Sequence, residues 1–368
     1  MTRPTYQKTH TMKHRLFAHG RLRRAAERFA RTATLCATTL FAACTHSAGG
    51  TETIEGFALG TLYQVTVSGP APADLRTKVE AVCAEADSTM SVFNPRSLLS
   101  RINRNETDSL TEDIARNIAL ARRVSELSGG KYDITVQPLV DAYGFIGGRQ
   151  EAAPDIDSLL RYVGYDKIAV RDGRLVKQHP EIQIGLNSIA KGYTVDKIAR
   201  MLEREGVRDY LVNVGGEIFC RGVNASGERW RIAIDTPYEG NWSPGANTST
   251  LLHVSEVGVA TSGNYRNFHT GPDGRKYTHI IDPATGGNTE SNLLSATVVA
   301  ESCTLADAMA TMYMVLGLEA SLTLLEEHPD FAVLLIHAGE HGEMNLYVSP
   351  AMEQYMQPSA PPRLRPTA

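Results

Sequence analysis

The segment TLADAMATMYMVLG, residues 304–317, predicts a helix that has to lie in a core, because nearly all of its side chains are apolar. Its apolar positions are Leu305, Ala308, Met309, Met312, Tyr313, Val315 and Leu316. Asp307 and Thr311 interrupt this run and, being four residues apart, share one face of the helix. A buried carboxylate is costly unless its charge is compensated. The fold therefore has to bring a partner to the face that Asp307 and Thr311 form.

Two interpretations of this pair are open from the sequence. A carboxylate and a hydroxyl on one helix face offer the oxygen ligands that Mg²⁺ or Ca²⁺ prefers, and Mg²⁺ needs only one or two protein carboxylates. In the other interpretation, Asp307 caps a helix that begins near Thr304, and Thr311 donates a hydrogen bond to a carbonyl of its own helix. The spacing alone does not decide between them.

The rest of the chain mixes predicted helices and strands without a regular order. Helical spacing, capping residues and terminal glycines predict helices over 74–90, 111–130 and 188–206. Strands or hairpins are predicted over 56–69, 167–178, 210–222, 229–235, 276–282, 293–300, 331–339 and 344–349. Because several strands follow one another directly, the order favours an α+β fold, with mixed, largely antiparallel sheets and packed helices in a single domain.

The N-terminal segment has the pattern of an export signal. Synthesis begins at Met1 or Met12, the segment up to residue 31 is strongly basic, and the apolar or small run that follows ends in LFAAC at Cys44. LFAAC resembles a bacterial lipoprotein cleavage site, which predicts a lipid anchor on Cys44 at the periplasmic side of the inner membrane. An ordinary cleaved signal is the alternative. The predicted organisation is a lipoprotein-type signal peptide over 1–43, a tether over 44–53, the main folded domain over 54–350 and a Pro-rich tail over 351–368.

The charge of the mature chain argues against nucleic acid as a partner. The whole chain has 37 Lys and Arg against 41 Asp and Glu, and residues 1–43 hold nine of the basic residues and one acidic residue. The remainder keeps 28 basic and 40 acidic residues, a net charge of −12, which also argues against a basic membrane-binding patch. No stretch after the signal is expected to cross a bilayer. The remaining cysteines lack metal-ligand spacing and allow at most one disulfide; they are Cys83, Cys220 and Cys303.

Two other positions are candidates for chemistry. Lys191 follows a strand-to-helix junction, where backbone N–H groups and an ammonium charge suit a phosphate; a solvated lysine near a helix start is the alternative. His279 lies in the run KYTHIIDPATGG, three residues before Asp282, and strand alternation puts these two side chains on opposite faces. A structural histidine is therefore the alternative to a catalytic one.

Nine motifs occur in the order seen in the ApbE-type FAD:protein FMN transferases, and in these motifs the chain resembles that family. They are ALGTLYQV, MSVFNPRSLLSRIN, GGKYDITVQPLVDAYGF, VGYDKIAV, SIAKGYTVDKIA, LVNVGGEIFCRG, VATSGNYRNF, THIIDPATGG and LADAMATMYMVLG. The resemblance spans Gly56 to Gly317. It implies transfer of FMN from FAD to a Ser or Thr hydroxyl of an exported acceptor protein, such as a redox-pump or respiratory flavoprotein subunit. The bond formed is a phosphoester, with Mg²⁺ as cofactor and AMP as the released product.

The same resemblance implies roles for particular residues. Asp307, Thr311 and the backbone carbonyl of Ser188 would bind Mg²⁺, and Lys191 would contact the FAD phosphate. His279 is the candidate general base for the acceptor hydroxyl. The residues that would line the flavin and adenine parts of the pocket are Leu59, Phe93, Lys131, Tyr132, Asp133, Gly185 and Ile281.

Several positions depart from the family pattern, among them Asn187 and Ser188, which replace small residues. Leu59 replaces a methionine, Gly185 replaces an aspartate that contacts FAD, and Ala310 stands where several members have a second aspartate. Because the metal pair, Lys191 and His279 are present, we still expect an active enzyme. Two alternatives stay open: an Mg²⁺-dependent FAD pyrophosphatase that gives FMN and AMP, and an exported flavin-binding lipoprotein without catalysis.

Overall fold

The computed structural model describes the residues 50–146, 155–238, 247–264, 268–270, 276–278, 280–289, 291–341 and 343–356. The chain divides into two units, residues 1–45 and 46–368, and every described residue belongs to the second. The predicted signal peptide, the predicted anchor at Cys44 and the candidate base His279 lie outside the described residues.

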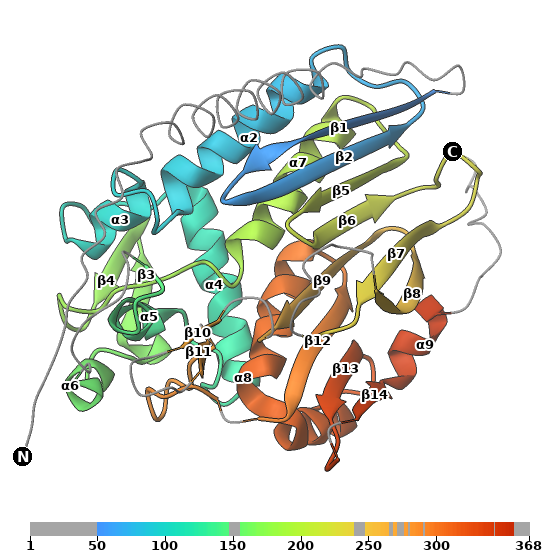
Figure 1. Cartoon of the computed structure of the whole chain (residues 1–368). Helices are drawn as coiled ribbons and strands as arrows, with labels where there is room; N and C mark the ends of the chain where they lie inside the picture. Colours follow the sequence, from blue (N-terminus) through green and yellow to red (C-terminus); the bar gives the residue numbers. More distant parts are fainter. Residues whose placement is uncertain are drawn as a thin grey trace, which may run out of the picture. The chain divides into compact units, whose positions relative to one another are not determined.

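An eight-stranded sheet organises the domain, in the order β1-β2-β5-β6-β9-β12-β13-β14 (Figure 1). Its strands are β1 (Thr51–Ala58), β2 (Thr61–Ser68), β5 (Tyr210–Val214), β6 (Glu217–Arg221), β9 (Val257–Gly263), β12 (Leu293–Ala300), β13 (Ala332–Ala338) and β14 (Met344–Val348). All neighbouring strands of this sheet run antiparallel. The described part also has three two-stranded sheets: β3 (Ile168–Arg171) with β4 (Arg174–Lys177), β7 (Trp230–Asp235) with β8 (Thr248–Val254), and β10 (Phe268–Thr270) with β11 (Lys276–Thr278).

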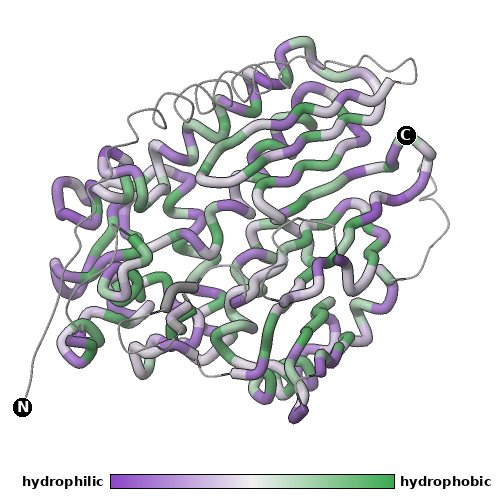
Figure 2. Tube along the Cα trace, viewed as in Figure 1, coloured by the Kyte–Doolittle hydropathy of each residue, from purple (hydrophilic) through white to green (hydrophobic). Residues whose placement is uncertain are grey.

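Helices pack on the large antiparallel sheet, which confirms the predicted α+β fold. The helices are α2 (Leu75–Met90), α3 (Leu98–Asn103), α4 (Glu112–Leu127), α5 (Gln137–Ala142), α6 (Ile156–Leu160), α7 (Ala190–Arg204), α8 (Cys303–Glu327) and α9 (Pro350–Met356), with short 3₁₀ turns η1 (Ile134–Val136) and η2 (Tyr165–Lys167). Helices α2 and α7 pack on β1, β2 and β5, where Val79 and Ile198 join Val65 and Val212 in one buried cluster. Strands β9, β12 and β13 contribute to two further clusters. In one they pack with α4 and α8. In the other they pack with β7, β8 and α9. In Figure 2 hydrophobic and hydrophilic colours alternate along strands such as β2, in which buried residues alternate with more exposed ones.

The predicted core helix over 304–317 is confirmed, and a further helical segment follows it directly. Helix α8 begins at Cys303 and continues to Glu327, although Gly317 interrupts it with a non-helical φ of 74° and ψ of 179°. In length and composition α8 could cross a membrane, which corrects the expectation that no stretch after the N-terminal segment would do so. In the domain, however, 56% of its most apolar window is buried, as in the core helix of a globular fold.

Several local predictions are confirmed because they rest on neighbouring residues. Asp172 and Gly173 join β3 to β4 with φ values of 49° and 71°, the conformation that a two-residue hairpin turn requires. The hydroxyl of Thr111 accepts the backbone N–H of Ile114 and caps α4.

Three predicted boundaries are wrong. Strand β1 begins at Thr51, inside the predicted tether, because residues 51–58 pair along their whole length with β2. The domain continues beyond residue 350, since α9 runs to Met356 and buries Met352 completely against the core. The strand predicted over 276–282 is shorter: β11 ends at Thr278, and Ile281 makes only an isolated bridge with Asn288.

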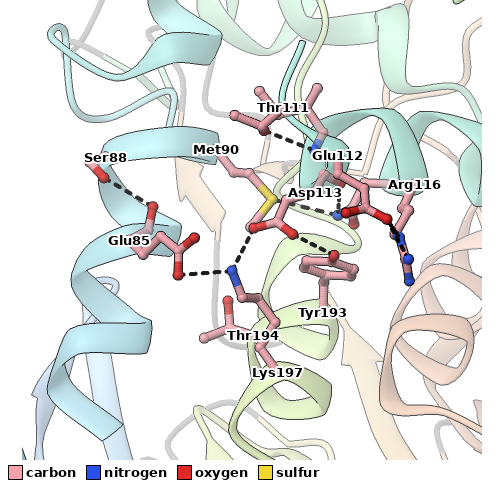
Figure 3. Close-up of polar contacts among 12 residues, drawn as sticks. Glu85, Ser88, Met90, Thr111, Glu112, Asp113, Arg116, Tyr193, Thr194 and Lys197 are labelled. Atoms are coloured by element: carbon pink, nitrogen blue, oxygen red, sulfur yellow. Dashed lines mark hydrogen bonds and ion pairs between the residues drawn. The ribbon is translucent and has the colours of Figure 1, made fainter. Parts of the chain in front are cut away.

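A polar cluster joins α2, α4 and α7 (Figure 3). The carboxylate of Asp113 in α4 accepts hydrogen bonds from the hydroxyl of Tyr193 at 2.7 Å and from Nζ of Lys197 at 2.5 Å, both in α7. Lys197 also pairs with Glu85 of α2 at 2.9 Å. The side chains of Lys197 and Asp113 are 16% and 19% exposed, so water screens this pair only weakly. The cluster holds α7 in place one to two turns from its N-terminus.

Replacing Asp113 with asparagine is expected to lower the free energy of unfolding at neutral pH by about 1–3 kcal/mol. Burial alone would raise the pKa of Asp113, but the bonds from Lys197 and Tyr193 outweigh it and hold the pKa below its ordinary value. The carboxylate therefore stabilises the fold above its unfolded pKa, and this stabilisation is lost as the pH falls through the lower folded pKa. Urea unfolding of both proteins across the acid range measures the effect.

The matched control is Glu112→Gln on the same turn of α4. Glu112 pairs with Arg116 at 2.5 Å, but the two side chains are 76% and 61% exposed, so no measurable change is expected. A difference between Asp113→Asn and wild type that stayed constant down to the lowest pH would contradict the assigned role of the carboxylate charge.

Candidate active site

The N-termini of α7 and α8 cap each other. The carboxylate of Asp307, in α8, accepts the backbone N–H of Gly192, in the first turn of α7, at 2.9 Å. In return, the carboxylate of Asp196, in α7, accepts the backbone N–H groups of Cys303 and Thr304, both at 2.9 Å. A helix start has unsatisfied N–H groups and a partial positive charge, both of which a carboxylate compensates. The partner of the Asp307 face is therefore the start of α7.

The interpretation of Asp307 as the cap of its own helix is wrong. The N-cap of α8 is Ser302, whose hydroxyl accepts the N–H of Leu305 at 3.2 Å. The hydroxyl of Thr311 lies 3.2 Å from that of Ser262 in β9. Asp307 is buried and Thr311 is partly exposed one turn later, so two oxygen donors face the junction of α7, α8 and β9.

Two glycines allow this close approach. A Cβ on Gly192 would lie 2.3 Å from the carbonyl oxygen of Cys303 and 2.8 Å from Cβ of Asp307. A Cβ on Gly258 in β9 would lie 2.2 Å from the backbone nitrogen of Cys303. Any larger residue at either position would displace the start of α8. The glycines thus determine how near Lys191, the neighbour of Gly192, comes to Asp307.

Lys191 forms an ion pair with Oε1 of Glu217, the first residue of β6. Glu217 is only 4% exposed, whereas 34% of the Lys191 side chain is exposed. Burial lowers the pKa of Lys191, but the charges of Glu217 and Asp307 outweigh it and hold that pKa above its ordinary value. Lys191 is therefore an ammonium ion beside the positive end of α7, an arrangement that suits a phosphate.

Two buried carboxylates share this single ammonium group. Burial, together with the charge of Asp307, raises the pKa of Glu217 to about 7 despite the opposing charge of Lys191. Burial also raises the pKa of Asp307, against the opposing effects of Lys191 and the Gly192 N–H. When both carboxylates are ionised, the three side chains have a net charge of −1. A bound cation would favour the ionised forms and lower both pKa values.

The motif GGKYD meets the start of α7 through one side chain. The hydroxyl of Tyr132, a buried residue, lies 2.9 Å from that of Ser188, two residues before α7. Lys131 instead pairs with Asp282 at 2.6 Å. Of the residues predicted to line a flavin pocket, Tyr132 is thus the one whose hydrogen bond reaches the predicted metal ligand Ser188.

Three other predicted pocket residues have structural roles. The carboxylate of Asp133 caps η1 and is already occupied by backbone N–H groups of Thr135 and Tyr165, each at 2.7 Å. Ile281 is 3% exposed and packs in a small apolar cluster. Leu59 lies in the β1–β2 turn with a positive φ of 52° and packs partly on the cores on both sides. Phe93, by contrast, is 64% exposed in the connection between α2 and α3 and is free to contact a ligand.

A family model described as the ApbE family matches residues 59–335. The chain belongs to the ApbE family. The FAD:protein FMN transferase of Salmonella typhimurium is 31% identical over 89% of this chain and 97% of its own length. That of Vibrio cholerae serotype O1 is 33% identical, over 78% of this chain and 88% of its own length. The crystal structure of Pseudomonas stutzeri flavinyl transferase ApbE in its apo form has a TM-score of 0.74 and 31% identity, covering 83% of this chain and 96% of that one.

Gly185, one of the positions at which this ApbE-family chain departs from the family pattern, lies against the side chain of Gln137. A Cβ on Gly185 would lie 2.1 Å from Oε1 of Gln137, a residue that is only 3% exposed. The amide of Gln137 donates to the carboxylate of Asp141 at 2.6 Å. The space for a side chain at position 185 is therefore filled by Gln137, and an aspartate there would have to displace it.

The residues of this ApbE-family site fit a divalent cation. Asp307 and Thr311 supply hard oxygen donors, and Oε2 of Glu217 is buried without a hydrogen-bond partner. Within the described ranges, no group of three or more His, Cys, Asp or Glu residues is placed to hold a metal ion. A cation here would thus take part of its ligand set from water, backbone carbonyls and phosphate oxygens, as Mg²⁺ does.

Sequence reasoning missed two residues of the junction, Asp196 and Glu217. Asp196 follows Gly192 by four residues and so shares its helix face, the same relation that singled out Asp307 and Thr311. That spacing would have identified it. Glu217 directly follows the glycines of a hairpin turn, and nothing in the local sequence indicates that its carboxylate is buried.

Proposed function

We propose that this protein transfers FMN from FAD to a Ser or Thr hydroxyl of an acceptor protein, with Mg²⁺ as cofactor and AMP as the released product. The supporting observation is that the region matched by the family model, residues 59–335, includes the junction of α7 and α8. There an ammonium group, a helix start and two hard oxygen donors meet. Phosphoryl transfer requires that the reacting groups be positioned and that the charge on the phosphates be neutralised, and these groups can do both.

The residues of the junction would divide the chemistry among them. Backbone N–H groups at the start of α7 and the ammonium of Lys191 would hold the pyrophosphate of FAD. Asp307 and Thr311 would hold Mg²⁺, which when bound neutralises negative charge on the phosphates. Ser188 would add its backbone carbonyl, held close by the Tyr132 contact.

The transfer step exchanges one P–O bond for another. The acceptor hydroxyl oxygen bonds to the phosphorus of the FMN half, the bond from that phosphorus to the bridging oxygen breaks, and AMP leaves with that oxygen. The hydroxyl proton passes to a general base. We assign this role to His279, whose neutral imidazole can accept a proton near pH 7; it lies outside the described residues.

We also propose that Cys44 bears a lipid anchor on the periplasmic side of the membrane and that the acceptor is an exported flavoprotein subunit. The basic segment and the LFAAC sequence support this location. Membrane fractionation of wild type and Cys44→Ser tests the anchor: the variant is expected in the soluble fraction, and unchanged membrane association would contradict it.

The function is tested with the purified full-length protein, FAD, Mg²⁺ and an acceptor domain that contains a flavinylated Thr. The expected result is covalent fluorescence on the acceptor with one AMP released per flavin, and loss of both when EDTA removes the metal. A Thr→Ala acceptor is the control for the site of attachment. Free FMN with an unlabelled acceptor would identify a pyrophosphatase, and intact FAD would identify a binding protein without catalysis.

A further inference from the structure

Glu217 has a carboxylate oxygen that the fold buries but does not use. Its Oε1 pairs with Lys191, whereas Oε2 is buried without a hydrogen-bond partner. A buried polar atom without a hydrogen-bond partner destabilises the fold, and more so when it is charged. Because Glu217 is only 4% exposed, bulk water does not readily supply the missing hydrogen bond to Oε2. The oxygen therefore needs a partner that is not part of the described chain.

The position of Glu217 is rigidly determined. It follows the turn Gly215–Gly216, whose φ values of 67° and 102° favour glycine, and it pairs in register with Val214 of β5. A Cβ on Gly215 would lie 2.8 Å from the Thr61 side chain, so the turn also packs against the β1–β2 hairpin. The hairpin therefore fixes the backbone of Glu217, and the ion pair with Lys191 keeps its carboxylate beside the start of α7.

Its surroundings have an excess of negative charge. Lys191 interacts with both Glu217 and Asp307, so when both carboxylates are ionised one of the two charges has no counter-charge. The buried thiol of Cys303 and the buried hydroxyl of Tyr132 also interact with these carboxylates, and burial raises the pKa of each well above its ordinary value, so both are neutral. A divalent cation held by Asp307 would supply the missing positive charge and, through a bound water or directly, a partner for Oε2.

We propose that Glu217 is a second carboxylate of the cation site, using Oε2 toward the cation or one of its waters while Oε1 keeps Lys191. The inference rests on the proposed function, because it presumes that Asp307 holds the cation. It assigns to β6 the second acidic group that Ala310 does not supply in α8. Glu217 also orients Lys191, so one side chain couples the ammonium group and the cation.

The test measures metal binding itself rather than turnover. Calorimetric titration with Mg²⁺, and electron paramagnetic resonance with Mn²⁺, are performed on the full-length protein with and without ADP, whose diphosphate can complete the ligand set. Glu217→Gln keeps the size of the side chain and its acceptor for Lys191 but removes the charge. The expected result is a 10–100-fold weaker affinity for the metal, the typical effect of losing a group that supports a metal ligand.

Two further variants keep the proposal falsifiable. Glu228→Gln, at an exposed glutamate in the β6–β7 connection, is expected to bind Mg²⁺ as wild type does. Thermal melts with and without Mg²⁺ show whether each variant is folded, since a ligand that binds the native state raises Tm. Glu217→Asp, which keeps a shorter carboxylate, is expected to bind more tightly than Glu217→Gln.

The outcomes separate the inference from the function on which it rests. Wild-type affinity in Glu217→Gln, together with loss of binding in Asp307→Asn, would overturn the role of Glu217 and leave the proposed cation at Asp307 intact. Absence of Mg²⁺ and Mn²⁺ binding in wild type, with and without ADP, would overturn the metal dependence and the inference with it.

Discussion

Replacing Asp307 with asparagine is expected to slow FMN transfer by about 10²–10³-fold, because a metal ion contributes several kcal/mol of charge stabilisation in phosphoryl transfer. In the wild type, Asp307 accepts a hydrogen bond of 2.9 Å from the backbone N–H of Gly192. Asparagine keeps an oxygen that can accept the same bond, so the cap of α7 is preserved. It removes only the charge that would bind the cation. Because burial raises the pKa of Asp307, the carboxylate costs energy in the metal-free fold. Without Mg²⁺ the variant is therefore expected to keep the wild-type Tm or exceed it.

The measurements are the rate of acceptor labelling and thermal melts with and without Mg²⁺. Wild type is expected to gain stability with Mg²⁺, and Asp307→Asn is expected to lose this gain. Asp330→Asn, at an exposed aspartate beyond the end of α8, is the control for the substitution itself. A variant that labelled the acceptor at half the wild-type rate would remove Asp307 from the metal site.

Gly192→Ala is expected to destabilise the protein, although alanine is the better helix former by about 1 kcal/mol. The added Cβ would lie 2.3 Å from the backbone carbonyl oxygen of Cys303, which cannot rotate away as a side-chain end could. Overpacking of this kind costs about 1–3 kcal/mol and sometimes more. The net effect is a lower Tm, by a few degrees for each kcal/mol lost, since about 2–4 °C per kcal/mol is usual for a large domain.

The sign of this effect is the informative result. Helix propensity alone predicts a higher Tm for Gly192→Ala, and the close approach of α7 to α8 predicts a lower one. Gly287→Ala is the matched control, because its Cβ would meet Oγ1 of Thr285 at an ordinary distance of 3.6 Å. Mg²⁺ affinity is expected to fall in Gly192→Ala as well, since the start of α8 and Asp307 would move together. An unchanged or higher Tm would contradict the contact.

The features that the sequence predicted correctly are those that neighbouring residues determine. Thr111 as the cap of α4 and the Asp172–Gly173 turn depend on side chains within three or four positions. The shared face of Asp307 and Thr311 follows from helix geometry alone, whereas the metal that the family resemblance implies for this face stays a prediction. Short elements were less predictable: α9 lies in a segment that its prolines suggested was a tail, and its burial of Met352 depends on the core around β8 and β13.

The site could not be completed from the sequence because its partners are distant along the chain. Glu217 lies 26 residues from Lys191, and Asp196 lies 107 residues from Cys303. Each contact depends on how the sheet places α7 between β6 and α8, which no local pattern encodes. Gly185 is another case: the sequence identified it only as the replacement of an aspartate, whereas the structure relates it to the side chain of Gln137.

The mutual capping of α7 and α8 also has a consequence for the order in which the protein folds. The bond from Gly192 to Asp307 joins residues 115 positions apart, so it closes one of the larger loops of the chain. Loop closure costs entropy before the contact stabilises anything, and folding slows as such distant contacts come to dominate. We expect α7 to form early with α2 and β5 and to keep unsatisfied N–H groups at its start until α8 arrives. A ribosome-bound chain that ends before residue 303 would contain Lys191 and Glu217 but no Asp307. Cation binding would then accompany the last stage of folding.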